Sequence, residues 1–283
     1  MDRFMNIKEK LLALAKEDKD IKAIVLIGSS TRDTVKADEY SDLDVVIATE
    51  ETEGWLYGDY PEKLGSVKIS FVEPTLGGGK ERRMLYDGSL DVDMIVFTPE
   101  QFEKAIREGV ASWVMNRGYE IMYDAEDYSD LLKENISHEL SPTDLSEPEF
   151  NNMVNDFFFH TVWASKKILR GELWTAKMCI DAYLKNYLLK MIEMYSVSKY
   201  QVDVWHDGRF LDRWAEREIL SDLEKCFARY DREDMVSALS ATLNLFCRLA
   251  GQTAEMKGYK YPKEAENYTK VEQTMDFRRK EER

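Results

Sequence analysis

The chain has 283 residues, of which 44% are hydrophobic and 33% are charged. A chain of this length buries about 75% of the surface that its unfolded state exposes, and it has room for one large domain or two smaller ones. The formal net charge is −15, which argues against a free polynucleotide as the substrate, because nucleic-acid-binding proteins are usually basic. An acidic surface favours a cationic partner instead.

The cysteines and the N-terminal residues predict the compartment. Cys179, Cys226 and Cys247 lie in apolar, helix-like patterns without Cys-x-x-Cys spacing, which is typical of buried free thiols in a reducing cytosol. Residues 1–20 lack the apolar core of a secretion signal, and no apolar run approaches the ~18 residues of a membrane span. We therefore expect a cytoplasmic protein without a membrane partner.

The first 97 residues predict a helix followed by strands. Residues 3–18 carry apolar side chains at helical spacing, which indicates an amphipathic helix. Short apolar or alternating runs predict strands at residues 21–28, 43–48 and 67–72. Residues 82–86 and 90–97 form a predicted hairpin, because Asp87-Gly88 between them is a strong turn signal.

The rest of the chain is predicted to be helical. Thr98-Pro99-Glu100-Gln101 has the pattern of a capping box with proline at the first helical position, and the segment from there to residue 135 reads as helical or irregular. Residues 137–148 are polar and contain two prolines, so we expect one domain at 1–136 and another at 137–283. A second capping box, Ser146-Glu147-Pro148-Glu149, begins a predicted bundle of four helices. The later three are expected at residues 174–195, 210–229 and 232–256, followed by a solvated, frayed tail.

The chemical signal lies between Ile24 and Ile47, where an apolar run ends in Gly28-Ser29 and a second run carries Asp42-x-Asp44. Residues i and i+2 of a strand point to the same face, so the two carboxylates stand side by side and repel each other. A hard divalent cation relieves this repulsion, and Mg²⁺ usually binds one or two carboxylates together with substrate phosphates. A Gly-Ser turn allows backbone N–H groups to approach a phosphate closely. These parts predict metal-assisted phosphoryl or nucleotidyl transfer.

A third carboxylate is available from a later strand, in which Asp91 and Asp93 share one face. Either of them with Asp42 and Asp44 would form a three-carboxylate, two-metal site. Alternatively, one of the two ends a strand or contacts Arg82 or Arg83. The sequence leaves the choice between Asp91 and Asp93 open.

The order Gly28-Ser29, Asp42-x-Asp44 and a later carboxylate resembles the signature of the polymerase-beta-like nucleotidyltransferases. The Asp87-Gly88-x-Leu90-Asp91 hairpin, the segment 166–177 and Tyr259-Lys260-Tyr261-Pro262 further resemble the aminoglycoside 6-adenylyltransferases, also called streptomycin adenylyltransferases. The resemblance covers nearly the whole chain. It implies an α+β nucleotidyltransferase domain with a mixed sheet flanked by helices, joined to a C-terminal all-α bundle that binds the substrate.

The resemblance also implies roles for individual residues. Gly28 and Ser29 match the family's nucleotide-binding turn, Asp42 and Asp44 match its paired metal ligands, and Asp91 matches its third carboxylate. Asp93 stands where the family usually has Thr, and it is a second catalytic candidate. Ser30 stands where the family often has Arg, so Arg32 either takes over the contact with the nucleotide or faces solvent. Asp181 is the expected contact for the acceptor.

The expected activity is transfer of AMP from ATP, with Mg²⁺ in a two-metal site, to a hydroxyl of a small polycationic acceptor such as an aminoglycoside. Three alternatives remain open: a different small acceptor such as a lincosamide, a protein or RNA acceptor as in toxin–antitoxin pairs, and a non-catalytic nucleotide-binding module. The retained carboxylates argue against the last, because a site without a metal has no need for buried acids that repel one another.

Overall fold

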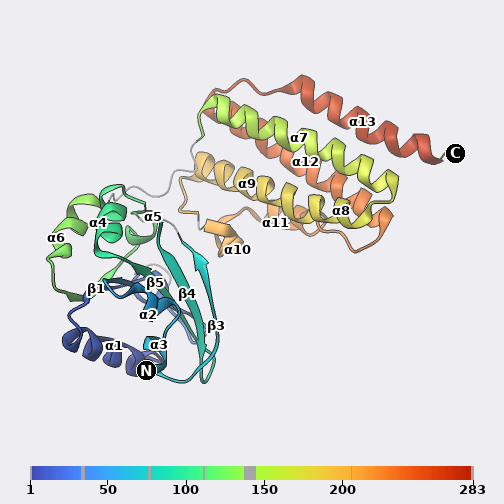
Figure 1. The fold of residues 1–283 in the computed structure, drawn as a ribbon. Coiled ribbons are helices and arrows are strands. Elements are labelled where there is room, and N and C mark those ends of the chain that lie inside the picture. The colour runs from blue at the N-terminus through green and yellow to red at the C-terminus, as the bar shows by residue number, and fades with distance from the viewer. Residues whose placement is uncertain are drawn as a thin grey trace. The chain divides into compact units, whose positions relative to one another are not determined.

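The structure, a computed structural model, describes residues 2–32, 36–75, 78–110, 112–136, 145–204 and 206–281. The chain folds into two compact units, Met1–Ser141 and Pro142–Arg283 (Figure 1). Most of the predicted boundary segment, residues 137–144, lies outside the described residues.

The N-terminal unit is built on a mixed six-stranded sheet with the order β3-β4-β5-β2-β1-β6 (Figure 1). Its central pair, β2 and β5, is parallel, and the other neighbouring pairs are antiparallel. The strands span β1 Ile21–Ile27, β2 Leu43–Thr49, β3 Val67–Pro74, β4 Lys80–Tyr86, β5 Leu90–Phe97 and β6 Glu120–Asp124.

Helices cover both faces of this sheet, because the strands alternate apolar side chains between two cores. One core packs α1 (Met5–Glu17), α2 (Thr52–Leu56) and α3 (Tyr60–Leu64) against one face. The other packs α4 (Pro99–Arg107), α5 (Ser112–Met115) and α6 (Tyr128–Asn135) against β1, β2 and the end of β5. Asp44 of β2 and Asp91 and Asp93 of β5 also lie on this second face. In each strand they precede, along the sequence, the apolar residues that these helices cover.

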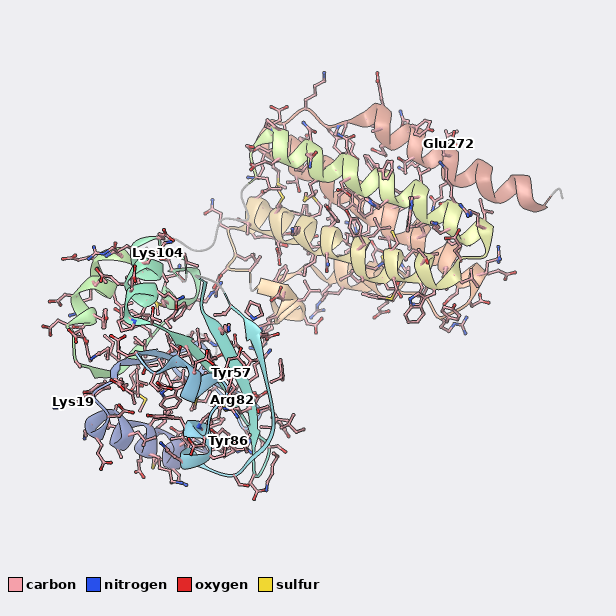
Figure 2. All side chains as sticks on the ribbon, in the orientation of Figure 1. Lys19, Tyr57, Arg82, Tyr86, Lys104 and Glu272 are labelled. Atoms are coloured by element: carbon pink, nitrogen blue, oxygen red, sulfur yellow. The ribbon has the colours of Figure 1, made fainter. Side chains whose placement is uncertain are left out.

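Two side chains of β4 fix the small helices to the first face (Figure 2). The buried guanidinium of Arg82 donates to the carbonyl oxygens of Trp55, at 3.3 Å, and Gly58, at 2.7 Å. The hydroxyl of Tyr86 donates to the carbonyl of Pro61 at 3.0 Å. These bonds satisfy backbone acceptors of the two small helices and of the turn between them. Since side chains alternate along a strand, Arg83 points to the opposite face.

The C-terminal unit is all-helical among its described residues. The long helices α7, α9 and α12 pack against one another, and α13 packs along α7 (Figure 1). The elements are α7 Glu147–Arg170, α8 Leu173–Met178, a π-helix at Cys179–Tyr183, α9 Leu184–Tyr200, a 3₁₀ turn at His206–Gly208, α10 Leu211–Trp214, α11 Arg217–Leu223, α12 Arg232–Lys257 and α13 Lys263–Glu281. In the part of the chain that the structure describes, no helix is long and apolar enough to cross a membrane.

The predicted fold class, a mixed sheet flanked by helices plus an all-α region, is confirmed, as are the hairpin and both capping boxes. Three expectations are wrong. Residues 120–124 form a strand, β6, where the sequence predicted helix or irregular structure. The helix predicted at 210–229 is divided into α10 and α11. The tail predicted to be frayed is α13.

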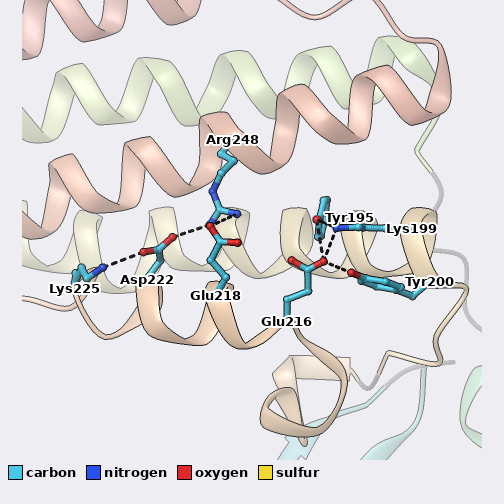
Figure 3. Close-up of polar contacts among 8 residues, drawn as sticks. All are labelled: Tyr195, Lys199, Tyr200, Glu216, Glu218, Asp222, Lys225 and Arg248. Carbon is cyan, nitrogen blue, oxygen red and sulfur yellow. Dashed lines mark hydrogen bonds and ion pairs between the residues drawn. The ribbon is translucent and has the colours of Figure 1, made fainter.

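Polar contacts hold the residue that separates α10 from α11, as Figure 3 shows. Glu216 precedes α11 in an extended conformation, with ψ of 143°. Its Oε1 accepts hydrogen bonds from the hydroxyl of Tyr195 at 3.1 Å, from Nζ of Lys199 at 2.6 Å and from the hydroxyl of Tyr200. These three donors all belong to α9, so this arrangement ties the start of α11 to the C-terminal turns of α9.

Candidate active site

The turn after β1 is shaped by glycine. Gly28 has φ of +74°, a conformation that costs L-residues about 1–2 kcal/mol, and a Cβ at this position would lie 2.0 Å from Oδ2 of Asp44. Ser29 is buried, and its hydroxyl donates to the carbonyl of Asp42 at 3.3 Å. The turn therefore packs directly on the Asp42-x-Asp44 segment. Arg32 follows it and is half-buried.

Three carboxylates converge beside this turn. Oxygen atoms of Asp42, Asp44 and Asp93 lie within 4.8 Å of one another, and this is the one such group with metal-ligand composition among the described residues. The parallel register of β2 and β5 produces it, because Asp44 is directly opposite Asp93. Asp93 is only 3% exposed, whereas Asp42 and Asp44 are half-buried. Asp91 is outside the group of three, although it shares their face of the sheet.

A cation already neutralises part of this charge. Nε of Arg83 donates to Oδ1 of Asp93 at 3.1 Å, and Nη2 lies 2.7 Å from Oδ2. The hydrogen bond and charge of Asp93 raise the pKa of Arg83, so the guanidinium stays charged. The same guanidinium lies 3.6 Å from Glu73 and 3.5 Å from Glu81. The site is therefore a row of carboxylates from β2, β5, β4 and β3, and the guanidinium of Arg83 lies among them.

Two further acids of this row hold their protons more tightly than usual. Burial raises the pKa of Glu81 to about 7, and the nearby charge of Asp93 adds to the effect. Burial, then the charges of Asp93 and Asp42, raise the pKa of Asp91. Both shifts have the same origin, since crowded, partly buried carboxylates disfavour one another's charged form.

The donor set of Asp42, Asp44 and Asp93 fits a hard divalent cation. All three offer oxygen ligands at a shared point, which suits Mg²⁺ and leaves the remaining positions for waters or phosphate oxygens. A soft metal would require sulfur or imidazole ligands, and neither occurs in this group.

Five of the eight predicted site residues converge. Arg32 follows the turn, Asp91 lies outside the group of three carboxylates, and Asp181 is on another element. The structure brings Gly28, Ser29, Asp42, Asp44 and Asp93 together at one end of the β1–β2 hairpin. Asp181 lies in the helical unit, on the π-helix, where it forms an ion pair with Lys177. Its Oδ1 is buried and forms no hydrogen bond with the described residues.

The sequence interpretation missed two supporting features. Gly118 has φ of +136°, and a Cβ there would lie 2.3 Å from the carbonyl oxygen of Thr31, whose hydroxyl donates to the carbonyl of Gly118 at 2.9 Å. The turn that carries Gly28 therefore packs against the loop before β6. Arg83 is predicted only as a possible contact of Asp91 or Asp93, although the Asp87-Gly88 turn sets a register in which Arg83 is opposite Asp93.

Comparisons with known proteins give a family model and two relatives that each match most of the chain. Residues 1–274 match the family model described as streptomycin adenylyltransferase. An aminoglycoside 6-adenylyltransferase of Bacillus subtilis (strain 168) is 21% identical over 277 residues, covering 92% of this chain and 93% of the relative. One of Campylobacter jejuni is 20% identical over 268 residues, covering 89% and 88%.

Two solved structures are similar to the chain as well. The crystal structure of an aminoglycoside 6-adenyltransferase from Bacillus subtilis aligns with 96% of both chains at 17% identity and a TM-score of 0.45. A nucleotidyltransferase-like protein from Exiguobacterium sibiricum aligns with 88% of this chain and 78% of its own at 11% identity and a TM-score of 0.40.

Proposed function

Because the chain belongs to the streptomycin adenylyltransferase family, a family of enzymes, we propose that it transfers AMP from MgATP to a hydroxyl of an aminoglycoside. The single observation that carries the chemistry is the convergence of Asp42, Asp44 and Asp93. The net charge of −15 suits a polycationic acceptor, and no observation favours a lincosamide, a protein or RNA in its place.

The three carboxylates are the proposed metal ligands. When bound, two Mg²⁺ ions would neutralise charge on the triphosphate and lower the pKa of the attacking hydroxyl. We place Asp93 in the third position, in preference to Asp91, because its carboxylate belongs to the converging group. Gly28 and Ser29 are proposed to present the backbone of their turn to the phosphates, with Arg32 as a nearby positive charge.

The reaction forms a bond between the acceptor oxygen and the α-phosphorus and breaks the bond from that phosphorus to the oxygen bridging to the β-phosphorus. Pyrophosphate leaves. The hydroxyl proton passes to a carboxylate, for which Asp91 is our choice, because it shares the face of Asp93 and is not required as a ligand. In the helical unit, Asp181 is the proposed contact for an amine of the acceptor, since its carboxylate is partly exposed and already binds one amine, that of Lys177.

The proposal includes the cellular compartment in which the enzyme acts. Cys179, Cys226 and Cys247 are free and buried, which suits a reducing compartment. ATP is abundant there, so we propose that the enzyme acts in the cytoplasm.

Pyrophosphate release with ATP, Mg²⁺ and a panel of aminoglycosides that includes streptomycin tests the function. The parent should turn over at least one of them, and Asp42→Asn should lower kcat/KM at least ~100-fold, equivalent to about 3 kcal/mol of lost transition-state stabilisation. Asp130→Asn is the matched control, because Asp130 is an exposed acid on α6 paired with Lys133. Absence of turnover on every aminoglycoside would eliminate the proposed acceptor, and full activity of Asp42→Asn would eliminate the metal site.

A further inference from the structure

Asp93 occupies a position where an unpaired charge would destabilise the fold. It is only 3% exposed, and it stands in the middle of a strand, with Asp44 on the neighbouring strand on one side. A buried carboxylate needs a partner, because its desolvation is otherwise uncompensated. Arg83 supplies that partner from the strand on the other side, where it is directly opposite Asp93.

The contact between them has a fixed geometry. Arg83 binds Asp93 through two nitrogens, with Nε to Oδ1 at 3.1 Å and Nη2 to Oδ2 at 2.7 Å. A planar guanidinium that binds both oxygens of a carboxylate fixes its rotation as well as its charge. Each carboxylate oxygen has a second lone pair, so this contact leaves acceptor capacity for a metal on the side of Asp42 and Asp44.

We infer that Arg83 is a positioning residue that holds the Asp93 carboxylate in the orientation in which it binds the metal. The inference rests on the proposed function, because it takes Asp93 as a metal ligand. Arg83 acts through Asp93, as the outer partners of metal ligands commonly do, and their loss typically weakens metal binding about 10–100-fold.

The positive charge of Arg83 has a second, opposite effect, since it repels a cation bound nearby. Replacing Arg83 by a neutral residue would change orientation and repulsion together. Arg83→Lys separates them, because lysine keeps the charge but is a single point donor without the planar fork. The change in metal affinity of this variant then reports the orientation of Asp93.

The experiment measures binding of Mn²⁺ to the nucleotide-free full-length chain, from the electron paramagnetic resonance signal of the free ion. Arg83→Lys should raise the Kd for Mn²⁺ at least ~10-fold. Arg107→Lys is the matched control and should leave it unchanged, because Arg107 binds Glu103 through two nitrogens on the exposed surface of α4. An unchanged or lower Kd for Arg83→Lys would overturn the inference. Arg83 is half-exposed, so we expect its replacement to leave the protein folded. Urea unfolding of each variant checks this.

A double-mutant cycle with Asp93→Asn separates the inference from the proposed function. Asp93→Asn should weaken Mn²⁺ binding, and adding Arg83→Lys to it should weaken binding no further, because no ligand is left to position. A further loss in the double variant would show general loosening of the sheet and overturn the inference. Normal binding by Arg83→Lys with weak binding by Asp93→Asn overturns the inference alone. Normal binding by Asp93→Asn removes the proposed third ligand itself.

Discussion

Gly28→Ala tests whether the turn after β1 shapes the metal site. The new methyl group would lie 2.0 Å from Oδ2 and 2.9 Å from Cγ of Asp44. An ordinary contact requires about 3.4 Å, so the carboxylate must move by about 1.4 Å or the turn must shift. The backbone at φ of +74° adds its own cost for a residue with a Cβ.

Two contributions determine the magnitude. The left-handed conformation costs alanine about 1–2 kcal/mol, and crowding a packed site costs a further ~1–3 kcal/mol. We therefore expect Gly28→Ala to lower the free energy of unfolding by about 2–5 kcal/mol. The effect on function should be larger, because misplacing a reacting group by 1 Å costs about 100-fold in rate.

Gly78→Ala is the control. Gly78 has φ of +81°, but a Cβ there would meet nothing within 4 Å, so this variant carries the backbone cost alone. Urea unfolding should show a smaller loss for Gly78→Ala, and Mn²⁺ binding and pyrophosphate release should change only in Gly28→Ala. Equal stability losses, or normal Mn²⁺ binding by Gly28→Ala, would refute the assignment of this turn to the site.

Three further predictions concern single charged groups. Asp93→Asn should raise the Kd for Mn²⁺ more than Asp91→Asn does, and the reverse order in the same titration would return Asp91 to the third ligand position. Glu216→Gln should lower the free energy of unfolding at pH 7 by about 1–3 kcal/mol, because hydrogen bonds to a charged acceptor are lost, and the difference from the parent should shrink at pH 4. Lys185→Met should abolish a rise in stability of the parent, up to about 3 kcal/mol, between pH 8 and pH 10.5 in urea unfolding.

The signs of the two pH effects follow from the direction of each shift. Burial raises the pKa of Glu216, but hydrogen bonds from Lys199, Tyr200 and Tyr195 outweigh it and lower the pKa below its ordinary value. Its contribution is therefore present above pH 4.5 and is lost as the pH falls through the lowered pKa. Burial lowers the pKa of Lys185 to about 8, so between pH 8 and 10.5 the unfolded chain binds more protons and stability rises with pH. A pH-independent Glu216→Gln effect, or an unchanged slope in Lys185→Met, would contradict these assignments.

The sequence was informative where the signal is local. Asp42 directly precedes β2 and Asp44 is its second residue, the Asp87-Gly88 turn joins two adjacent strands, and both capping boxes lie within four residues, so pattern and spacing suffice. The choice between Asp91 and Asp93 is not local. It depends on the parallel register of β2 and β5, which sets Asp44 opposite Asp93 across a long connection.

The missed elements have polar or irregular interfaces. The buried face of α13 includes Glu266, Thr269 and Gln273, and Glu266 binds Lys263 and Lys270 at 2.9 and 2.6 Å. No apolar periodicity marks such a helix, so the segment reads as a solvated tail. Strand β6 is short, lies at the sheet edge and pairs with β1 through a register shift, which removes the alternation expected of a strand.

Asp93 shows why two interpretations of one carboxylate can both hold. The sequence offered a metal ligand or a contact of Arg83 as alternatives, yet the strand order places Arg83 and Asp44 on opposite sides of Asp93. An antiparallel hairpin fixes the first neighbour and a parallel pairing fixes the second, so neither excludes the other. The arginine compensates the charge of this buried carboxylate, which still has oxygen lone pairs for a metal. The ion pair that makes Asp93 tolerable in the fold is therefore the same contact that would orient it for chemistry.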